Sequence, residues 1–422
     1  MEWIRLLNIQ KEKNRIEYDF RVSEGLSRFF SGKPFVIEYP EEIETVPDAV
    51  AAVPFVSCVI PMIWVTGAVL EVSELDKAFW DCLPKLKKGY EAMYPETTFS
   101  GELHVGEIVE CTVPASGRCA AFFSGGLDSV QTLIRHLEEK PDLISIWGSD
   151  VNFDNEEGWK LVSGPIREYA RKYGLHAVTI RSGFRAFDLE WEMDKVYIDQ
   201  IKSNWWYGMK HGVALLGHAA PYAYLKGLST VYIASSNSPE EVDVRCASDP
   251  TLDNHVRFVN CRVIHDGYEF GRQAKVHNIV EYVRRTGDQV SLHVCWESQA
   301  GRNCCECEKC YRTMVGLMAE GEDPAPYGFE DGAETLGKMR QVLIGGKKIK
   351  DNVSLEWTTI HQAVVRNEEM LRGKPYWKYI KWVKKADFTH YETLKLSAPY
   401  RLRVWLSQFP LLQKIYNLRK LF

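Results

Sequence analysis

The chain has 422 residues, a formal net charge of −5 and 45% hydrophobic residues, which is enough apolar material for the cores of two or three domains. Residues 1–5 run quickly into charged side chains and are not a signal peptide. The 11 cysteines of a chain without an export signal are expected to be reduced in the cytoplasm, which favours metal binding over disulfides.

Residues 1–115 are predicted to form a small α+β appendage. Short apolar runs at 20–22, 35–39 and 68–72 precede a helix-like pattern over 75–94. We expect this appendage to shape or cover the substrate pocket.

The uncharged segment 49–70 is long enough, at about 20 residues, to be tested as a transmembrane helix. Pro54 and Pro61 interrupt it, so we interpret it as buried strands joined by turns.

A glycine pair separates an apolar strand predicted over residues 120–123 from a helix predicted over 130–138. Glycine lets the backbone approach a ligand closely, and the first N–H groups of a helix carry partial positive charge. The segment therefore predicts an anion cradle rather than an ordinary strand-to-helix turn. The usual nucleotide loop, with four residues between its glycines and then Lys-Ser/Thr, does not fit this spacing. The residues of the cradle are Ser124, Gly125, Gly126, Leu127, Asp128 and Ser129.

Strand and helix patterns alternate through residues 116–325, the predicted catalytic domain. Further strands are expected at 143–146, 176–180 and 230–234, with helices at 159–173 and 205–227. Such repetition predicts an α/β fold with a doubly wound parallel sheet, whose ligands bind beyond the carboxyl ends of the strands.

Four cysteines follow the pattern Cys-x8-Cys-x2-Cys-x2-Cys: Cys295, Cys304, Cys307 and Cys310. This spacing predicts a tetrahedral four-thiolate Zn²⁺ site without an open position for water, and therefore a structural role. Buried free cysteines, disulfides and an iron–sulfur cluster are the alternatives. Cys305 is given no ligand role, because one zinc ion takes four donors.

Residues 326–422 are predicted to form a helical, basic carboxyl-terminal region. Residues 338–422 contain 18 Lys or Arg and 6 Asp or Glu, although the whole chain is acidic. Segment 400–422 mixes Trp, Phe and Leu with Lys and Arg. We consider three roles: a helical cap on the protein itself, peripheral contact with a membrane surface, and contact with RNA.

The Ser-Gly-Gly-x-Asp-Ser loop resembles the pyrophosphate loop of the N-type ATP pyrophosphatase superfamily. Together with the four-cysteine pattern, which has the same order and separation, residues 118–320 resemble 7-cyano-7-deazaguanine synthase. The resemblance implies an adenine nucleotide alpha hydrolase-like fold, with ATP, Mg²⁺ and Zn²⁺ as cofactors. About 115 residues before the loop and about 100 after the cysteines depart from that family. In this the chain looks closer to uncharacterised relatives of the synthase.

The resemblance also implies roles for individual residues. The hydroxyls and N–H groups of the loop would hold pyrophosphate, and Asp128 would hold Mg²⁺. Lys275 falls where the family places a lysine before a helix, and its charge could neutralise the departing phosphate. Asp128, Ser129 and Lys275 are therefore the predicted catalytic residues, unless Lys275 is an exposed helix lysine.

Further cofactor-binding candidates follow from the same comparison. Ile146 and Trp147 end the second strand, where the superfamily's adenine lies, although Trp147 could equally belong to the core. Lys210 and His211 lie where the synthase begins a ligand-facing helix. Three more residues are either substrate contacts or turn-forming residues: Asp249, Asp253 and His265.

The function expected from these residues is a carbon–nitrogen ligase. It would adenylate a small-molecule carboxylate, release pyrophosphate, and let ammonia or an amine attack to give an amide or a nitrile. A homodimer is compatible with the family. The alternatives are a nucleic-acid-modifying enzyme such as an RNA thiolase, with Cys246 or Cys261 as the reactive thiol, and a non-catalytic nucleotide-binding module.

Overall fold

The computed structural model describes residues 1–242, 244–295, 302–329, 336, 351–386 and 388. By contacts the chain divides into two compact units. Unit 1 comprises Met1–Thr286 and Ser291–Arg302, and unit 2 comprises Gly287–Val290 and Asn303–Phe422.

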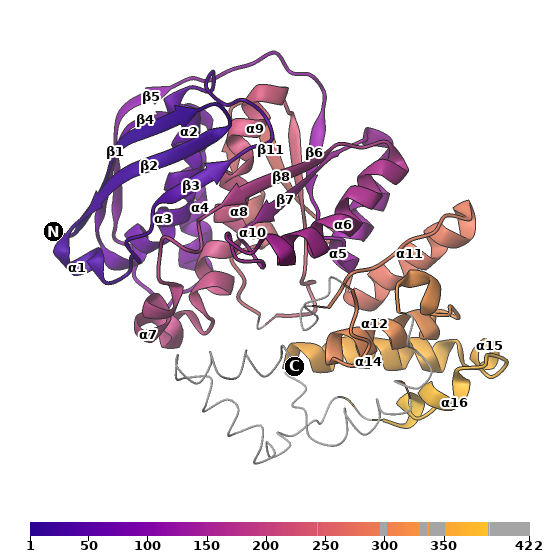
Figure 1. Ribbon diagram of the computed structural model, residues 1–422. Helices are drawn as coiled ribbons and strands as arrows, with labels where there is room; N and C mark the ends of the chain where they lie inside the picture. Colours follow the sequence, from indigo (N-terminus) through magenta and orange to yellow (C-terminus); the bar gives the residue numbers. More distant parts are fainter. Residues whose placement is uncertain (243, 296–301, 330–335, 337–350, 387, 389–422) are drawn as a thin grey trace. The chain divides into compact units, whose positions relative to one another are not determined.

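Unit 1 is built around one mostly parallel, mixed sheet of eleven strands in the order β10-β11-β9-β6-β7-β8-β3-β2-β1-β4-β5 (Figure 1). The run β8-β7-β6-β9-β11 is parallel throughout. The strands are β1 Trp3–Glu12, β2 Arg15–Val22, β3 Phe35–Glu38, β4 Val69–Asp76, β5 Glu102–Val109, β6 Cys119–Phe122, β7 Asp142–Trp147, β8 Ala177–Ser182, β9 Thr230–Ala234, β10 Arg257–Phe258 and β11 Cys261–Asp266.

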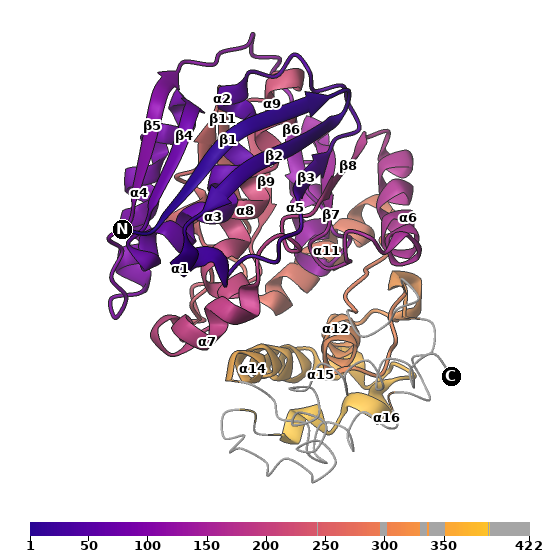
Figure 2. The ribbon, with the colours of Figure 1, turned by 60° about the vertical axis from the view of Figure 1, so that its left-hand side comes forward.

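The α/β class expected from the sequence is confirmed at this level. Strands β6, β7, β8 and β9 lie within one or two residues of their expected positions. The first 115 residues contribute five strands to the same sheet, because β3 pairs antiparallel with β8 through Ile37↔Ser182 and Glu38↔Arg181 (Figure 2). The domain boundary at residue 115 stays a prediction.

The helices of unit 1 pack on this sheet and on one another. Helix α5 contacts β6, β9 and α11, whereas α3 contacts α8, β4 and β5. The helices are α1 Glu24–Ser27, α2 Asp48–Ala51, α3 Val53–Thr66, α4 Lys77–Met93, α5 Leu127–Arg135, α6 Glu156–Tyr173, α7 Glu190–Ile201, α8 His211–Gly217, α9 Ala219–Lys226, α10 Pro250–Asp253 and α11 Arg272–Thr286, with a 3-10 turn η1 Leu137–Glu139 and a π-helical turn η2 Trp206–Lys210.

The expectation of strands over residues 49–70 is wrong, because the segment forms α2, α3 and only the first residues of β4. Pro54 lies in the first turn of α3, where its missing N–H costs nothing. Pro61 lies inside the helix, and Gly67 ends it with a left-handed φ of 66°. The helix is buried nearly all round, which compensates for the hydrogen bond lost at Pro61. An apolar run of this kind does not distinguish a buried strand from a buried helix.

The single helix expected over residues 205–227 is also wrong in part, because the segment is divided into η2, α8 and α9. Pro221 has no N–H for the carbonyl of Gly217, so the helix is interrupted after that residue. The preceding π-helical turn widens the backbone just before His211.

Unit 2 is helical where it is described. Its elements are α12 Glu308–Ala319, η3 Ala325–Tyr327, α14 Asp351–Arg366, α15 Glu368–Leu371, α16 Trp377–Ile380 and η4 Val383–Lys385. Trp357 Nε1 donates to Glu308 Oε1 at 2.9 Å and thereby fixes α14 against α12. The proposed membrane or RNA segment 400–422 lies outside the described residues. Within the described part of the chain, no helix combines the length and the apolar character needed to cross a membrane.

Candidate functional site

The predicted anion cradle lies between the end of β6 and the start of α5. Gly125 has a left-handed φ of 75°, which favours glycine at this position. Ser129 Oγ donates to the Gly126 carbonyl at 3.1 Å, and the Gly126 N–H donates to Ser124 Oγ at 3.3 Å. Both hydroxyls are thus held at the amino-terminal end of α5, where the helix dipole favours a negative charge.

Lys275 links its own helix to the segments that follow β6 and β9, at the carboxyl edge of the sheet. It belongs to α11, is 1% exposed, and its Nζ donates to Asp128 Oδ1 at 2.9 Å. The same ammonium donates to the carbonyl of Ser235, directly after β9. The structure therefore brings Ser124, Asp128, Ser129 and Lys275 together. A buried ammonium there holds the Asp128 carboxylate in one place and places a positive charge beside the loop.

A second carboxylate accompanies this group. The Glu241 side chain accepts from the Ser238 N–H at 2.7 Å and interacts electrostatically with Lys275 and Asp128. Burial raises the pKa of Glu241, and the ammonium of Lys275 acts in the opposite direction. Glu241 is thus a second carboxylate near the Lys275 ammonium, and the Mg²⁺ expected at Asp128 stays a prediction.

The adenine-side candidates lie at the end of β7. Ile146 is 8% exposed, and Trp147 is half-buried. The Trp147 ring stacks on Trp159 with centroids 5.6 Å apart, and the Arg181 guanidinium lies 4.4 Å from the Trp147 centroid. Trp147 is thus part of an aromatic–cation stack, and its contact with adenine stays a prediction.

Lys210 contacts Asp188 and Phe184 rather than the glycine loop. Its ammonium is fully buried, and it donates to Asp188 Oδ2 and to the Phe184 carbonyl, both at 2.6 Å. Burial raises the pKa of Asp188 to about 6 despite the attraction of Lys210. This ion pair ties η2 to the segment after β8, so the structure does not bring Lys210 together with Asp128. Its predicted phosphate role remains a prediction.

The remaining candidates form a separate polar cluster near the end of β11. His265 Nδ1 lies 2.8 Å from Asp253 Oδ2, and Asp249 caps α10 by accepting from the Thr251 N–H at 2.9 Å. His211 begins α8, and its ring meets Trp206 edge-on with centroids 4.9 Å apart. Burial lowers the pKa of His211, which keeps its imidazole neutral at neutral pH.

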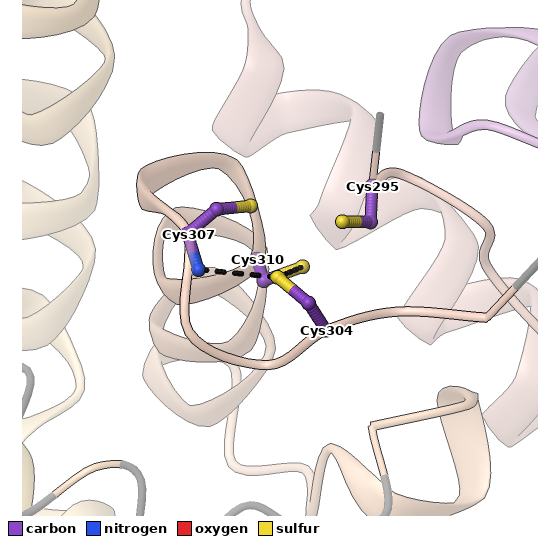
Figure 3. Close-up of side chains that lie close together, drawn as sticks. All are labelled: Cys295, Cys304, Cys307 and Cys310. Atoms are coloured by element: carbon purple, nitrogen blue, oxygen red, sulfur yellow. Dashed lines mark hydrogen bonds between the residues drawn. The ribbon is translucent and has the colours of Figure 1, made fainter. Parts of the chain in front are cut away.

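The four cysteines of the predicted metal site lie close together, with their sulfur atoms all within 4.8 Å of one another (Figure 3). Cys304 Sγ lies 3.9 Å from Cys310 Sγ and accepts from the Cys307 N–H at 3.3 Å. A tetrahedral Zn²⁺ with bonds of about 2.3 Å requires sulfur separations of about 3.8 Å. The donor set and its spacing therefore fit a metal such as zinc.

Three further cysteines considered above, Cys246, Cys261 and Cys305, do not belong to this cluster. Cys305 has a left-handed φ of 56°, and its sulfur contacts the Asn303 carbonyl at 3.8 Å. Burial raises the pKa of both Cys246 and Cys261 to about 12. Each is therefore a protonated thiol at neutral pH, which is a poor nucleophile.

Two contacts around the loop and Lys275 could not have been found from the sequence. The Ser235 carbonyl binds Lys275, and the His293 N–H donates to the Gly125 carbonyl at 2.8 Å. Both join positions far apart in the chain through backbone atoms, which leave no mark on residue type. Glu241 stands in the acidic run of residues 240–243, which matches no motif.

No family model, curated protein or solved structure matches this chain.

Proposed function

We propose that this protein is an ATP-dependent ligase that forms AMP and pyrophosphate. It would adenylate a small-molecule carboxylate and pass the acyl group to ammonia or an amine, as 7-cyano-7-deazaguanine synthase does. The observation that carries the proposal is the Lys275–Asp128 pair, at 2.9 Å, beside a glycine loop at the start of α5. The fold of that synthase and the use of ATP and Mg²⁺ belong to this proposal.

The chemistry follows from the groups at the loop. A carboxylate resists amines because oxide is a poor leaving group, and attachment of AMP replaces it with a stabilised phosphate. The N–H groups of α5 and the hydroxyls of Ser124 and Ser129 would bind the pyrophosphate as its charge develops. Lys275 would hold Asp128 in place, and Mg²⁺ bound by Asp128 would supply further charge neutralisation. No side-chain nucleophile is required.

The thiolase alternative is less well supported by the described residues. Cys246 and Cys261 are protonated and 2% and 1% exposed, respectively. The proposal therefore assigns the four-cysteine site to structural zinc and leaves the remaining thiols in the core.

The test is pyrophosphate release combined with ATP calorimetry on the full chain. We expect MgATP binding, and pyrophosphate exchange in the presence of at least one member of a carboxylate panel. Asp128→Ala should lower the exchange rate by about 100-fold. Asp19→Ala, at an exposed position of β2, is the matched control and should behave as the unchanged chain. Absence of ATP binding, or formation of ADP instead of AMP, would disprove the ligase.

A further inference from the structure

A buried histidine–aspartate pair lies at the carboxyl end of β11. The side chains of His265 and Asp253 are each 1% exposed, and Nδ1 lies 2.8 Å from Oδ2. Ser248 Oγ donates to the same carboxylate oxygen at 2.7 Å. With Asp253 accepting at Nδ1, a neutral His265 carries its proton on Nδ1 and its lone pair on Nε2. We call Ser248, Asp253, His265 and the nearby His211 the His265 cluster.

Three buried polar atoms of this cluster have no hydrogen-bond partner within the described residues: His265 Nε2, Asp253 Oδ1 and His211 Nδ1. Buried polar atoms are paired in the large majority of cases, so three unpaired ones in one cluster need an explanation. Asp253 Oδ1 can only accept, and His265 Nε2 accepts in the tautomer that Asp253 selects. A group that donates an N–H bond would satisfy Nε2, on the side of the ring that faces away from Asp253.

The cluster lies at the same edge of the sheet as the loop. Strand β11 pairs parallel with β9 through His265↔Ile233, and β9 pairs parallel with β6 through Ala121↔Tyr232. The connection after β9 contacts both regions: the Ser235 carbonyl accepts from Lys275, and the Ser235 N–H donates to the carbonyl of Asp266, next to His265, at 2.8 Å. Ligands of parallel α/β sheets bind beyond this edge, on both sides of the point where the strand order reverses.

Neighbouring elements hold the cluster in place. His211 interacts electrostatically with Asp150, after β7, and with Asp253 and His265. A Cβ added at Gly212 would lie 2.4 Å from Asp253 Oδ1, so only glycine lets α8 pass this close to the carboxylate. The cluster is therefore positioned between α8, α10 and the end of β11.

We propose that the His265 cluster binds the nitrogen nucleophile, an ammonium ion or a primary alkylammonium group, and that His265 Nε2 takes up the proton which this nitrogen must lose. This inference rests on the proposed ligase function. Ammonium has N–H donors and no lone pair, which suits the lone pair of His265 Nε2, and the negative charge of Asp253 across the ring favours a cation there.

The proposed step combines a proton transfer with the exchange of one bond at the carboxyl carbon. One proton moves from ammonium to Nε2, and the Asp253 carboxylate stabilises the imidazolium that results. The freed lone pair forms the C–N bond with the adenylated carboxyl carbon, while the C–O bond to the phosphate breaks and leaves its electron pair on AMP. The second proton lost by the nitrogen passes to water. Asp253 acts here as a positioning residue for His265.

Ammonium binding can be measured without knowing the carboxylate. In full-length protein with ¹⁵N-labelled histidine, we expect the His265 Nε2 signal to shift saturably with ammonium chloride and not with potassium chloride. His265→Gln identifies that signal by its loss. It should also weaken ammonium binding, followed through His211, by about tenfold or more. His104→Gln, whose side chain is 59% exposed in the unchanged chain, is the matched control and should retain binding.

The outcomes separate this inference from the ligase itself. No ammonium-specific shift at His265, or full affinity in His265→Gln, overturns the inference. If His265→Gln does not fold, Asp253→Asn replaces it, because loss of the carboxylate charge removes the stabilisation of a bound cation and should weaken ammonium binding by about tenfold or more. ATP calorimetry on the same samples reports on the ligase. ATP uptake without ammonium binding overturns the nucleophile site alone, whereas no ATP uptake overturns the ligase and this inference with it.

Discussion

Two buried lysines of unit 1 serve different parts of the structure. Lys275 neutralises Asp128, whose side chain is 23% exposed beside the loop, whereas the side chains of Lys210 and Asp188 are 0% and 2% exposed. A lysine that shares its charge with a partly exposed carboxylate can respond to a ligand. A lysine enclosed with its counter-ion mainly stabilises the fold, and removing one partner leaves an uncompensated buried charge.

Lys210→Met is expected to lower the free energy of unfolding by about 3–5 kcal/mol, because Asp188 is left without its cation. Urea unfolding followed by tryptophan fluorescence measures this. Lys195→Met, whose side chain is 59% exposed in the unchanged chain, should change stability by no more than about 0.5 kcal/mol.

The same variant tests the phosphate role predicted for Lys210. If Lys210→Met is as stable as the unchanged chain but has lost affinity for ATP, the ammonium contacts phosphate and the structural interpretation is wrong.

Two cysteine variants test the metal site. Cys310→Ser removes one of the four clustered thiols, and we expect most of the bound zinc to be lost, since a structural site requires all four ligands. Cys305→Ser should keep one equivalent, because its sulfur faces the Asn303 carbonyl. Elemental analysis of the purified variants decides between them. Equal zinc in both would show that the cluster is not the metal site.

At the scale of elements, the close contact of α3 with α8 depends on one glycine. A Cβ at Gly217 would lie 2.0 Å from Ser57 Oγ, whereas a Cβ at Gly164, inside α6, would have nothing within 4 Å. The first glycine therefore allows two helices to approach, and the second does not serve packing.

Gly217→Ala should destabilise the protein by about 1–3 kcal/mol through overpacking. Gly164→Ala should leave stability unchanged or raise it by up to about 1 kcal/mol, because alanine is the better helix former. Thermal unfolding of the two variants tests the pair. An equal effect at both positions would contradict the close approach of α3 and α8 at Gly217.

The sequence was informative where local patterns decide the element. The alternation from β6 to β9 was readable because each strand is a short apolar run followed by a helical period. Helix α3 was missed because a fully buried helix has no polar face, and its two prolines favoured strands and turns. The division between α8 and α9 depends on Pro221, whose effect on the Gly217 carbonyl could have been anticipated.

The candidate site was predictable only in part. The loop and the four cysteines are local motifs, so their residues could be named in advance. The association of Lys275 with Asp128 and Ser235 depends on the crossing of β6, β9 and α11, which no local pattern contains. The burial of Lys210 with Asp188 is of the same kind, because two distant segments have to meet before the charge is enclosed.

At the scale of the whole molecule, the sheet of unit 1 joins what the sequence suggested were separate parts. Only two residue pairs connect β3 to β8, yet they make the strands of the first 115 residues continuous with those that carry the loop. The segments were distinguishable by composition and pattern. Their pairing was not, because strand partners far apart in the chain are chosen by packing rather than by local sequence.

Because the sheet of unit 1 is continuous, its unpaired edges belong to its two outermost strands. The outermost strands are β10, which has only two residues, and β5, which has eight. An unprotected edge strand can pair with a strand of another chain, which is how fibrils begin. The long border of β5 carries exposed Glu102 and Glu107, so a second copy approaching it would meet like charge. We therefore expect these two carboxylates to disfavour the addition of further chains at β5.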